Sequence, residues 1–536
     1  MAREGSNGER TEPQLTTSQH AARIALLAAF AAALLGWLAA RTEVMYADGL
    51  RYIAGAQAAE RGDWKATIMR AVDHPIYPLA VAGAHKALVG GERPQDWQTA
   101  AQAVSVAAGV LLVIPLYLVA LELYGPAVAW LACLLTYMVP VTGHVLADVL
   151  AEGVFLLFWT WGCWFALRFF RHGSTAWLPP TLAAAALAYM TRPEGLLLPA
   201  ALAATLCLMI VRPSIRFSRP VWLRATALVV VGPLLLVGPY VALKGGIGTK
   251  PAVARLFGLA PKSSAMAVER ERPLDPDQSA VKAFATSCRG MFRAVQGAVT
   301  TPLLIMAGLG LLLRSPDHDP GRARGRWFVG IICVAWALAL VRLYATGGYC
   351  TPRHALILAL PLIAAAARAV VRLSEIAAAR LAGDATEGRR RLVQATACAG
   401  CLAFCGSLWG ASTLAPVNES YAGYRQAGDW LEAHTAPDAR VFDLKGWALF
   451  YGQRPGYSFG DLGRAPGEAG LSWVVAHDAF LIGPWSYCQS IRDLVGDRTP
   501  IRSFPETRRK GMSQVHIFEL SPGTARSEAV DPTTRR

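Results

Sequence analysis

The stretch TAAQAVSVAAGVLLVIPLYLVAL, residues 99–121, contains no charged side chain. A helix of about 20 apolar residues spans the hydrocarbon core of a bilayer, so this stretch predicts a transmembrane helix. The whole chain has a similar character, because 54% of its 536 residues are hydrophobic, only 17% are charged, and the mean hydropathy is +0.34. This composition excludes an ordinary soluble globular protein.

Further apolar segments of similar length follow one another along the chain. We therefore predict an all-α polytopic membrane protein with about 11 transmembrane helices. The first segment is too long for a signal-peptide core, so we expect it to be retained. Besides residues 99–121, the expected spans are 21–40, 127–147, 154–170, 178–190, 196–211, 222–243, 298–313, 327–345, 355–371 and 393–412.

The formal charge of +15 is concentrated in short arginine clusters between these segments. Such clusters mark the cytoplasmic side of a membrane protein and do not indicate a nucleic-acid partner. When the spans alternate in direction, every cluster falls on the cytoplasmic side, which predicts a multi-pass protein of the inner (plasma) membrane. The clusters are Arg168 and Arg171; Arg212, Arg216, Arg219 and Arg224; Arg314, Arg322, Arg324 and Arg326; and Arg389, Arg390 and Arg391.

The segments outside the membrane divide the chain. We expect a disordered cytoplasmic tail over residues 1–20, a transmembrane domain over 21–412, and two large extracytoplasmic loops, 41–98 and 244–297. Within the first loop, residues 75–90 are apolar but short, and we expect an interfacial or re-entrant helix. The alternative, a short tilted span, would place the later arginines outside.

After residue 412 the chain has more Asp, Glu, Gly, Tyr and Pro and no run long enough to cross a bilayer. We predict a small soluble extracytoplasmic α/β domain over 413–536, with a helix at 421–434 and strands at 440–444, 472–476 and 515–520.

The ten cysteines carry little functional signal. The spacing of Cys398 and Cys401 fits a redox or metal motif, but close packing of small residues between helices explains it better. Cys288, Cys350 and Cys488 fall outside the spans, where one disulfide could form.

Charged residues at the opposite ends of the spans are candidates for chemistry. Asp48, Arg51 and Tyr52 follow the first span and would share one face of a short helix. The alternative is an interfacial helix with a snorkelling arginine and a tyrosine at the headgroups.

Asp148 and Glu152 enter the fourth span one helical turn apart. An acid beside the bilayer core costs roughly 2.5–3.5 kcal/mol unless it is paired or solvated, so two acids predict a wet cavity. The alternative is a helix start, where the dipole favours acids.

Two breaks between spans present further charges on the same side. Pro193 prevents a continuous helix through Arg192, so Arg192 and Glu194 project from a tight turn. Arg353 and His354 follow a later span. An arginine on the extracytoplasmic side opposes the positive-inside rule, which favours a function over a simple turn.

Five motifs together resemble the GT-C glycosyltransferases, specifically the bacterial relatives of protein O-mannosyltransferases and of the lipid A aminoarabinose transferase. The resemblance runs in order over about residues 20–370. The motifs are Asp48-x-x-Arg51-Tyr52, His74-Pro-Ile-Tyr77-Pro78, Val-Leu-Ala-Glu-Gly-Val-Phe at 149–155, Tyr-Met-Thr-Arg-Pro-Glu-Gly at 189–195, and Pro-Arg-His at 352–354.

This resemblance implies an inverting transferase that takes a sugar from a polyprenyl-phosphate donor on the extracytoplasmic face of the membrane. Asp48 would match the family's general base, and either Asp148 or Glu152 its second acid. His74 and Arg192 would face the lipid phosphate, and Arg353-His354 would match the family's late Arg-Tyr or Arg-His pair. Arg51, Tyr52, Tyr77 and Glu194 complete the expected substrate-binding set.

The chemistry of these side chains agrees with that role. A phosphate leaving group departs as a stable anion, so arginines such as Arg192 and Arg353 suffice to stabilise it. Asp48 would deprotonate an acceptor hydroxyl on a lipid, a protein or a glycan. We expect no required cofactor and assign no metal site, although two acids could hold a divalent metal.

Two other classes of protein fit the same composition. A transporter or flippase of a lipid-linked or anionic substrate would use the acids to relay protons or bind cations, but it predicts charges at the bilayer midplane and inverted repeats. A structural assembly protein would need none of these charges. The position of the acids at span ends favours the enzyme.

Overall fold

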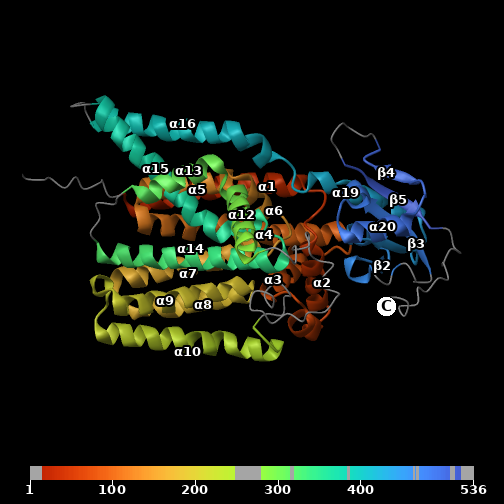
Figure 1. The fold of residues 1–536 in the computed structure, drawn as a ribbon, viewed down its shortest axis with the longest axis horizontal. Helices are drawn as coiled ribbons and strands as arrows, with labels where there is room; N and C mark the ends of the chain where they lie inside the picture. Colours follow the sequence, from red (N-terminus) through yellow and green to blue (C-terminus); the bar gives the residue numbers. More distant parts are fainter. Residues whose placement is uncertain are drawn as a thin grey trace, which may run out of the picture.

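The computed structural model describes residues 15–247, 279–313, 319–382, 387–462, 465, 470–506 and 513–520. Within these ranges, long helices run side by side in a bundle, and a smaller α/β domain covers one end of it (Figure 1). The helices of the bundle are α1 (Thr17–Arg41), α4 (Pro94–Tyr124), α5 (Pro126–Met138), α6 (Pro140–Ala147), α7 (Glu152–His172), α8 (Leu178–Tyr189), α9 (Leu197–Val211), α10 (Arg219–Lys244), α12 (Ala280–Val299), α13 (Thr301–Leu312), α14 (Pro320–Gly347), α15 (Leu356–Ala382) and α16 (Glu387–Leu414).

The predicted class, a polytopic helical membrane protein, is confirmed, but the expected count of 11 spans is not. Among the described residues, eight helices are long and apolar enough to cross a bilayer, or up to ten if each of two bent helix pairs is one span. The expected span at 178–190 is α8, which has 12 residues. A helix of that length rises only about 18 Å, which is shorter than the hydrocarbon core.

Both bent pairs have a local cause. Helices α5 and α6 meet at 70° just before Pro140, which has no backbone N–H to continue the first helix. Helices α12 and α13 meet at 99° at Thr300, whose φ of +74° lies in the left-handed region. Helix α12 therefore stands across its neighbours (Figure 1). The expected loop over 244–297 thus ends in a helix, and residues 248–278 of it lie outside the described residues.

Short helices lie between the bundle and the α/β domain (Figure 1). They are α2 (Asp48–Glu60) and α3 (Ile76–Ala84), with single π-helical turns over Lys65–Arg70 and His85–Val89. The apolar segment Ile76–Val89 is too short to count as a span, in keeping with the interfacial helix expected there.

The α/β domain contains a five-stranded sheet in the order β2-β1-β3-β5-β4. Strand β1 pairs in parallel with β2 and β3, whereas β5 pairs in antiparallel with β3 and β4. The predicted helix and three strands are confirmed, but the shortest strands, β2 and β4, were missed. The elements are α17 (Gly423–His434), β1 (Arg440–Asp443), α18 (Trp447–Tyr451), β2 (Gly456–Tyr457), β3 (Leu471–His477), α19 (Asp478–Ile482), α20 (Ser486–Val495), β4 (Arg502–Phe504) and β5 (Val515–Glu519).

Two further expectations need correction. Helix α1 begins at Thr17, where the Thr16 side chain accepts a hydrogen bond from the Gln19 backbone, so the expected tail over 1–20 ends inside a helix. Residues 1–14 and Arg314 lie outside the described residues. All ten cysteines are described and free, so the disulfide considered for Cys288, Cys350 and Cys488 is absent.

Candidate active site

A continuous series of ion pairs lies at the end of the bundle near the α/β domain. It alternates four carboxylates with three guanidiniums, and its members come from α2, from the start of α7 and from the turns before α3, α9 and α15. In order, the contacts are Asp73–Arg51 at 3.0 Å, Arg51–Asp48 at 2.9 Å, Asp48–Arg353 at 2.7 Å, Arg353–Glu152 at 3.7 Å, Glu152–Arg192 at 2.6 Å and Arg192–Glu194 at 2.8 Å.

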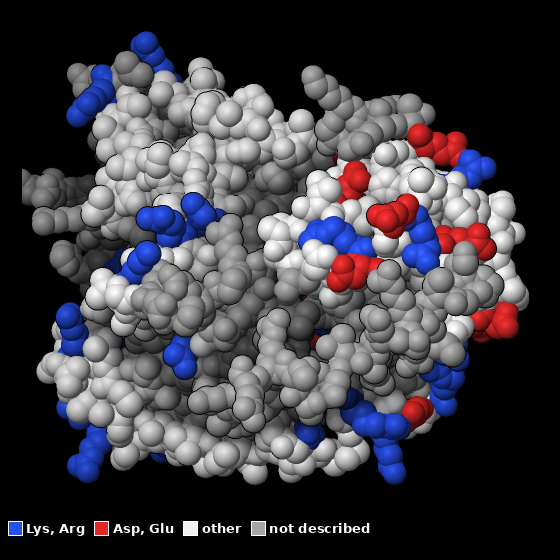
Figure 2. Space-filling model, turned by 45° about the vertical axis from the view of Figure 1, so that its right-hand side comes forward, with Lys and Arg blue, Asp and Glu red and all other residues white. Residues whose placement is uncertain are grey.

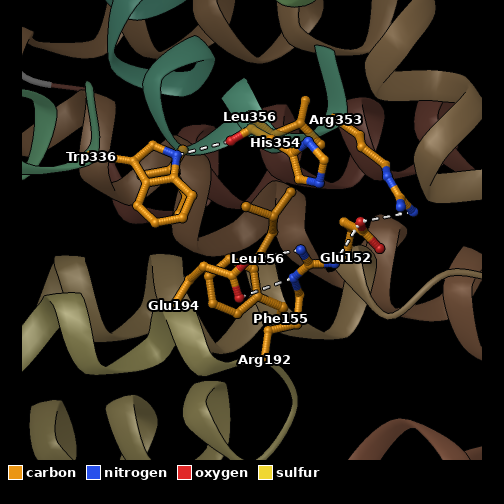
Figure 3. A pocket seen from close by; sticks show the side chains of 10 residues that line it. Glu152, Phe155, Leu156, Arg192, Glu194, Trp336, Arg353, His354 and Leu356 are labelled. Carbon is orange, nitrogen blue, oxygen red and sulfur yellow. Dashed lines mark hydrogen bonds and ion pairs between the residues drawn. The ribbon is translucent and has the colours of Figure 1, made fainter. Parts of the chain in front are cut away.

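The turn that carries Arg192 and Glu194 follows from its sequence. Arg192 precedes Pro193 and is extended, with φ −149° and ψ +142°, as the proline ring requires. At Gly195 the chain folds back so tightly that an added Cβ would lie 2.2 Å from the Tyr189 backbone nitrogen. Only glycine fits there. The turn aims the Arg192 guanidinium at Glu152, across the start of α7 (Figure 3).

Arg353 is held from several sides. Its Nη2 donates to Asp48 Oδ2 at 2.7 Å, and its Cζ lies 4.4 Å from the centre of the Tyr46 ring. Such a stacked guanidinium is oriented by the ring face as well as by the carboxylate. Arg353 Nε and Nη1 are buried and make no hydrogen bond to any described residue. This guanidinium therefore keeps donors for another anion.

The neighbouring His354 presents a defined ring nitrogen. Its Nδ1 accepts a hydrogen bond from the Thr351 backbone N–H at 3.2 Å and lies 2.9 Å from the Thr351 hydroxyl. A backbone N–H can only donate, so Nδ1 carries no proton and the hydrogen sits on Nε2. His354 thus offers a hydrogen-bond donor beside the arginines.

These residues line a narrow cleft between α7, α14 and the start of α15 (Figure 3). Its empty space is about 250 Å³, including the part open to solvent. The Glu152 side chain, which lines the cleft, is only 4% exposed, and Glu152 Oε2 accepts no hydrogen bond from any described residue. The lining residues are Glu152, Phe155, Leu156, Arg192, Glu194, Trp336, Arg353, His354, Leu356 and Ile357.

The structure distinguishes Asp148 from Glu152, the two candidates for the family's second acid. Asp148 does not share a helix face with Glu152, because it is extended, with φ −94° and ψ +172°, between α6 and α7. Its oxygens accept hydrogen bonds from the backbone N–H groups of Tyr46 and Val149 and from the Asn418 side chain. Burial raises the pKa of Asp148 to about 6, although these three donors oppose the shift. Only Glu152 faces the cleft.

Three predicted binding residues, Tyr52, His74 and Tyr77, belong neither to the series of ion pairs nor to the cleft lining. Tyr52 and Tyr77 pack edge-on, with ring centres 5.0 Å apart, and the Tyr77 hydroxyl is 2.8 Å from that of Ser105 in α4. His74 is buried, with Nδ1 3.2 Å from the Tyr240 hydroxyl. These side chains support the walls around the ion pairs.

Asp73, Tyr46 and Trp336 were not predicted. Asp73 directly precedes the His74-Pro75 motif, and its pairing with Arg51 could have been suspected from an acid in that position. Trp336 lies within an apolar span, where its indole N–H donates to the His354 carbonyl at 2.9 Å, and no local pattern distinguishes it.

Acidic and basic side chains on the surface are distributed unevenly between the two halves of the molecule. On the face shown in Figure 2, the acidic side chains of the described residues lie over the half that carries the α/β domain. On the other half of that face, the charged side chains of the described residues are all basic. This distribution agrees with the alternation of spans expected from the arginine clusters.

Residues 73–237 match the family described as dolichyl-phosphate-mannose-protein mannosyltransferase. ArnT from Cupriavidus metallidurans, solved with undecaprenyl phosphate, superposes with a TM-score of 0.55 at 13% identity, covering 94% of this chain and 98% of ArnT. The chain has the fold of the GT-C glycosyltransferases. The resemblance inferred from the five motifs is confirmed.

A second GT-C structure extends the likeness. The Archaeoglobus fulgidus oligosaccharyltransferase, tethered to an acceptor peptide with an NVT sequon, superposes with a TM-score of 0.54 at 11% identity. The match covers 90% of this chain and 72% of that protein. No curated protein sequence matches the chain.

Proposed function

We propose that this GT-C protein transfers a sugar from a polyprenyl-phosphate donor to an acceptor hydroxyl, with inversion at the anomeric carbon. The observation that carries the proposal is the series of consecutive ion pairs Asp48–Arg353–Glu152–Arg192, whose last three members line the cleft. We further propose that this end of the bundle faces the extracytoplasmic side of the inner membrane, opposite the arginine clusters.

Two arginines supply the phosphate site in this proposal. Arg192 and Arg353 both contact Glu152 Oε1, so they approach one another across the cleft. The free donors on Arg353 can bind a phosphate oxygen without breaking an existing hydrogen bond. The undecaprenyl phosphate in the ArnT structure supports a ligand of this class. The Nε2–H of His354 offers a further donor to the phosphate or the sugar.

Asp48 is the proposed general base. Its two oxygens contact Arg51 and Arg353, so its carboxylate is fixed at the edge of the cleft. An acceptor oxygen attacks the anomeric carbon, its proton passes to Asp48, and the anomeric C–O bond breaks with its electron pair moving to the phosphate. As the phosphate gains charge, Arg353 can shift from Asp48 toward it, which would leave the carboxylate a stronger proton acceptor.

Glu152 is the proposed second acid, and Asp148 is not. Glu152 lies between two arginines and fixes their directions, whereas Asp148 binds only neutral N–H donors. The mechanism routes no step through a metal. The possibility that Asp48 and Glu152 hold a divalent metal remains a prediction, which a chelator titration of the transfer reaction would test.

The test is transfer of radiolabelled sugar from polyprenyl-phosphate donors in membranes that contain the protein. Removing a general base typically costs about 10²- to 10⁴-fold, so Asp48→Asn should lose most of the transfer. Asp63→Asn is the matched control, because Asp63 lies after α2, where it pairs with the exposed Arg70 and accepts a hydrogen bond from the Ala66 N–H, and it does not line the cleft. Equal transfer by Asp48→Asn and wild type would remove Asp48 from the mechanism. No transfer by the wild type from any donor would favour the transporter.

A further inference from the structure

The segment 42–46, which joins α1 to α2, has no regular secondary structure, yet its backbone is held from several distant parts of the chain. We call it the entry loop. The Gln98 side chain in α4 donates to the Thr42 carbonyl at 3.1 Å. Two other contacts come from the C-terminal part of the chain, at Tyr451 and Asn418. Backbone groups outside helices and strands need such partners when they are buried.

Tyr451 makes the first of these contacts. Its side chain is fully buried at the end of α18, and its hydroxyl accepts a hydrogen bond from the Met45 N–H at 3.2 Å. The same hydroxyl donates to Gln98 Oε1 at 2.7 Å. One hydroxyl thus joins the α/β domain, the entry loop and the bundle. A phenylalanine ring would fill the same space without either bond.

Asn418 makes the second contact, just before the α/β domain. Its side-chain Nδ2 donates to the Val44 carbonyl at 3.1 Å and to Asp148 Oδ2 at 2.9 Å. Asp148 in turn accepts from the Tyr46 N–H at 3.0 Å. Asn418 also has a left-handed backbone, with φ +56°, which asparagine and aspartate tolerate better than most residues. An aspartate there would keep the backbone and reverse the side chain's role from donor to acceptor.

The entry loop leads directly into the proposed active site. Tyr46 stacks under Arg353, and Asp48 begins α2 two residues later. A shift of the entry loop would therefore move both the proposed base and the ring that orients its arginine. Distances matter at this scale, because a misplacement of about 1 Å can cost about 10²-fold in rate.

We propose that Tyr451 and Asn418 are positioning residues, through which the α/β domain sets the place of Asp48 and Tyr46 for the reaction. This inference rests on the proposed function. It assigns the α/β domain a part in catalysis that goes beyond covering the end of the bundle. The alternative is that both side chains only attach the domain to the bundle, in which case their loss would affect stability alone.

Two measurements on the full-length protein separate these readings. The first is hydrogen exchange of a peptide that covers residues 42–48. Tyr451→Phe should speed exchange of the Met45 amide, whose only side-chain partner among the described residues is the lost hydroxyl. Tyr457→Phe, which removes an exposed hydroxyl that contacts Arg440 in the same domain, should leave this peptide unchanged.

The second measurement is the split between kcat and the donor KM. Tyr451→Phe should lower kcat about tenfold, and Asn418→Asp, which faces a second carboxylate at Asp148, about a hundredfold. The donor KM should change less than kcat in both, because only Arg353 of the two arginines in the proposed phosphate site contacts the entry loop.

The exchange result tests the attachment of the entry loop whether or not the proposed function is correct. Unchanged exchange in Tyr451→Phe would overturn the attachment of the entry loop, whether or not the protein is active. Faster exchange with unaltered kcat would overturn the positioning role. A wild type that transfers no sugar would remove both the proposed function and the positioning role, while the exchange result would still stand for the loop.

Discussion

The two ends of the bundle use arginine in different ways. At one end, Arg353 and Arg192 pair with carboxylates inside a cleft, and Arg353 retains unused donors. At the other end, Arg324 donates to the carbonyls of Phe170 and Ile215, and Arg368 donates to the carbonyls of Gly310 and Leu313 at the C-terminal end of α13. The 21 residues of α7 separate the two ends by about 30 Å.

This difference shows how the setting of an arginine determines its use. Arg324 and Arg368 donate to carbonyls at helix ends, which lack a partner within the helix, so these two arginines stabilise the fold. Arg168 and Arg171 share the buried Glu122 at that same end. A guanidinium that pairs with carboxylates in a cleft and keeps free N–H groups can instead change partners when an anion arrives. Substitutions at the two ends of the bundle test this contrast.

The largest effect should come from Arg353. Replacing it with glutamine removes a guanidinium from Asp48, Glu152 and the proposed phosphate site at once. We expect kcat/KM for sugar transfer to fall about 10²- to 10³-fold, the usual range for losing one member of a buried charged pair. Membrane expression and thermal stability serve as the folding controls. Transfer within threefold of wild type in well-folded Arg353→Gln would contradict the contrast between the two ends.

A smaller effect should follow from Arg192→Lys, which keeps the charge but loses the planar fork. Arg192 contacts Glu152 and Glu194 with different nitrogens, which a single ammonium cannot reproduce. The donor KM should rise about tenfold, by the loss of one charge-assisted hydrogen bond, with little change in kcat. A fall confined to kcat would mean that Arg192 does not hold the donor in the ground state.

The pH dependence of kcat should reflect the protonation of Asp148. Because burial raises its pKa to about 6, Asp148 gains a proton as the pH falls through that value. The neutral carboxyl is a weaker acceptor for the Tyr46 N–H and the Asn418 amide than the carboxylate is, and the nearby charge of Glu152 also favours the proton. We expect kcat to fall about threefold across this midpoint through displacement of the entry loop. Asp148→Asn should have a lower kcat without that midpoint. The same midpoint in the variant would assign it to another group.

The smallest effect on activity should come from Glu122→Gln at the opposite end. This change removes the carboxylate shared by Arg168 and Arg171, so it should lower stability by about 1–2 kcal/mol. Transfer per folded protein should be unchanged, since Glu122 lies a whole helix length from the cleft. Thermal melting and the transfer assay on the same sample check both parts. A large loss of specific activity would show that the two ends are not independent.

The sequence predicted those features that depend on simple physical quantities. Apolar length identified the eight helices long enough to cross a bilayer, and the expected alternation of spans placed Asp48, Glu152, Arg192 and Arg353 at one end, where the ion pairs confirm that they lie near one another. Proline in Arg192-Pro193 correctly predicted a break. Each of these signals is local and is carried by a single residue type or run.

Other features needed the folded chain. The bend before Pro140 could not be predicted from apolar length. The crossing helix α12 could not be predicted from it either, because α12 is amphipathic and interrupted by charges. The spacing of Asp148 and Glu152 implied one helix, yet α7 begins only at Glu152. The contacts of Asn418 and Tyr451 with the entry loop join residues more than 370 positions apart, and no sequence pattern of one chain encodes them.

A cryo-EM map of the protein with undecaprenyl phosphate would test whether Arg353 and Arg192 bind the lipid phosphate in the cleft. The account predicts phosphate density in the cleft beside Glu152, within hydrogen-bond distance of both Arg353 and Arg192, with Arg353 moved away from Asp48. Phosphate density elsewhere on the protein, with the Asp48–Arg353–Glu152–Arg192 series intact, would contradict it.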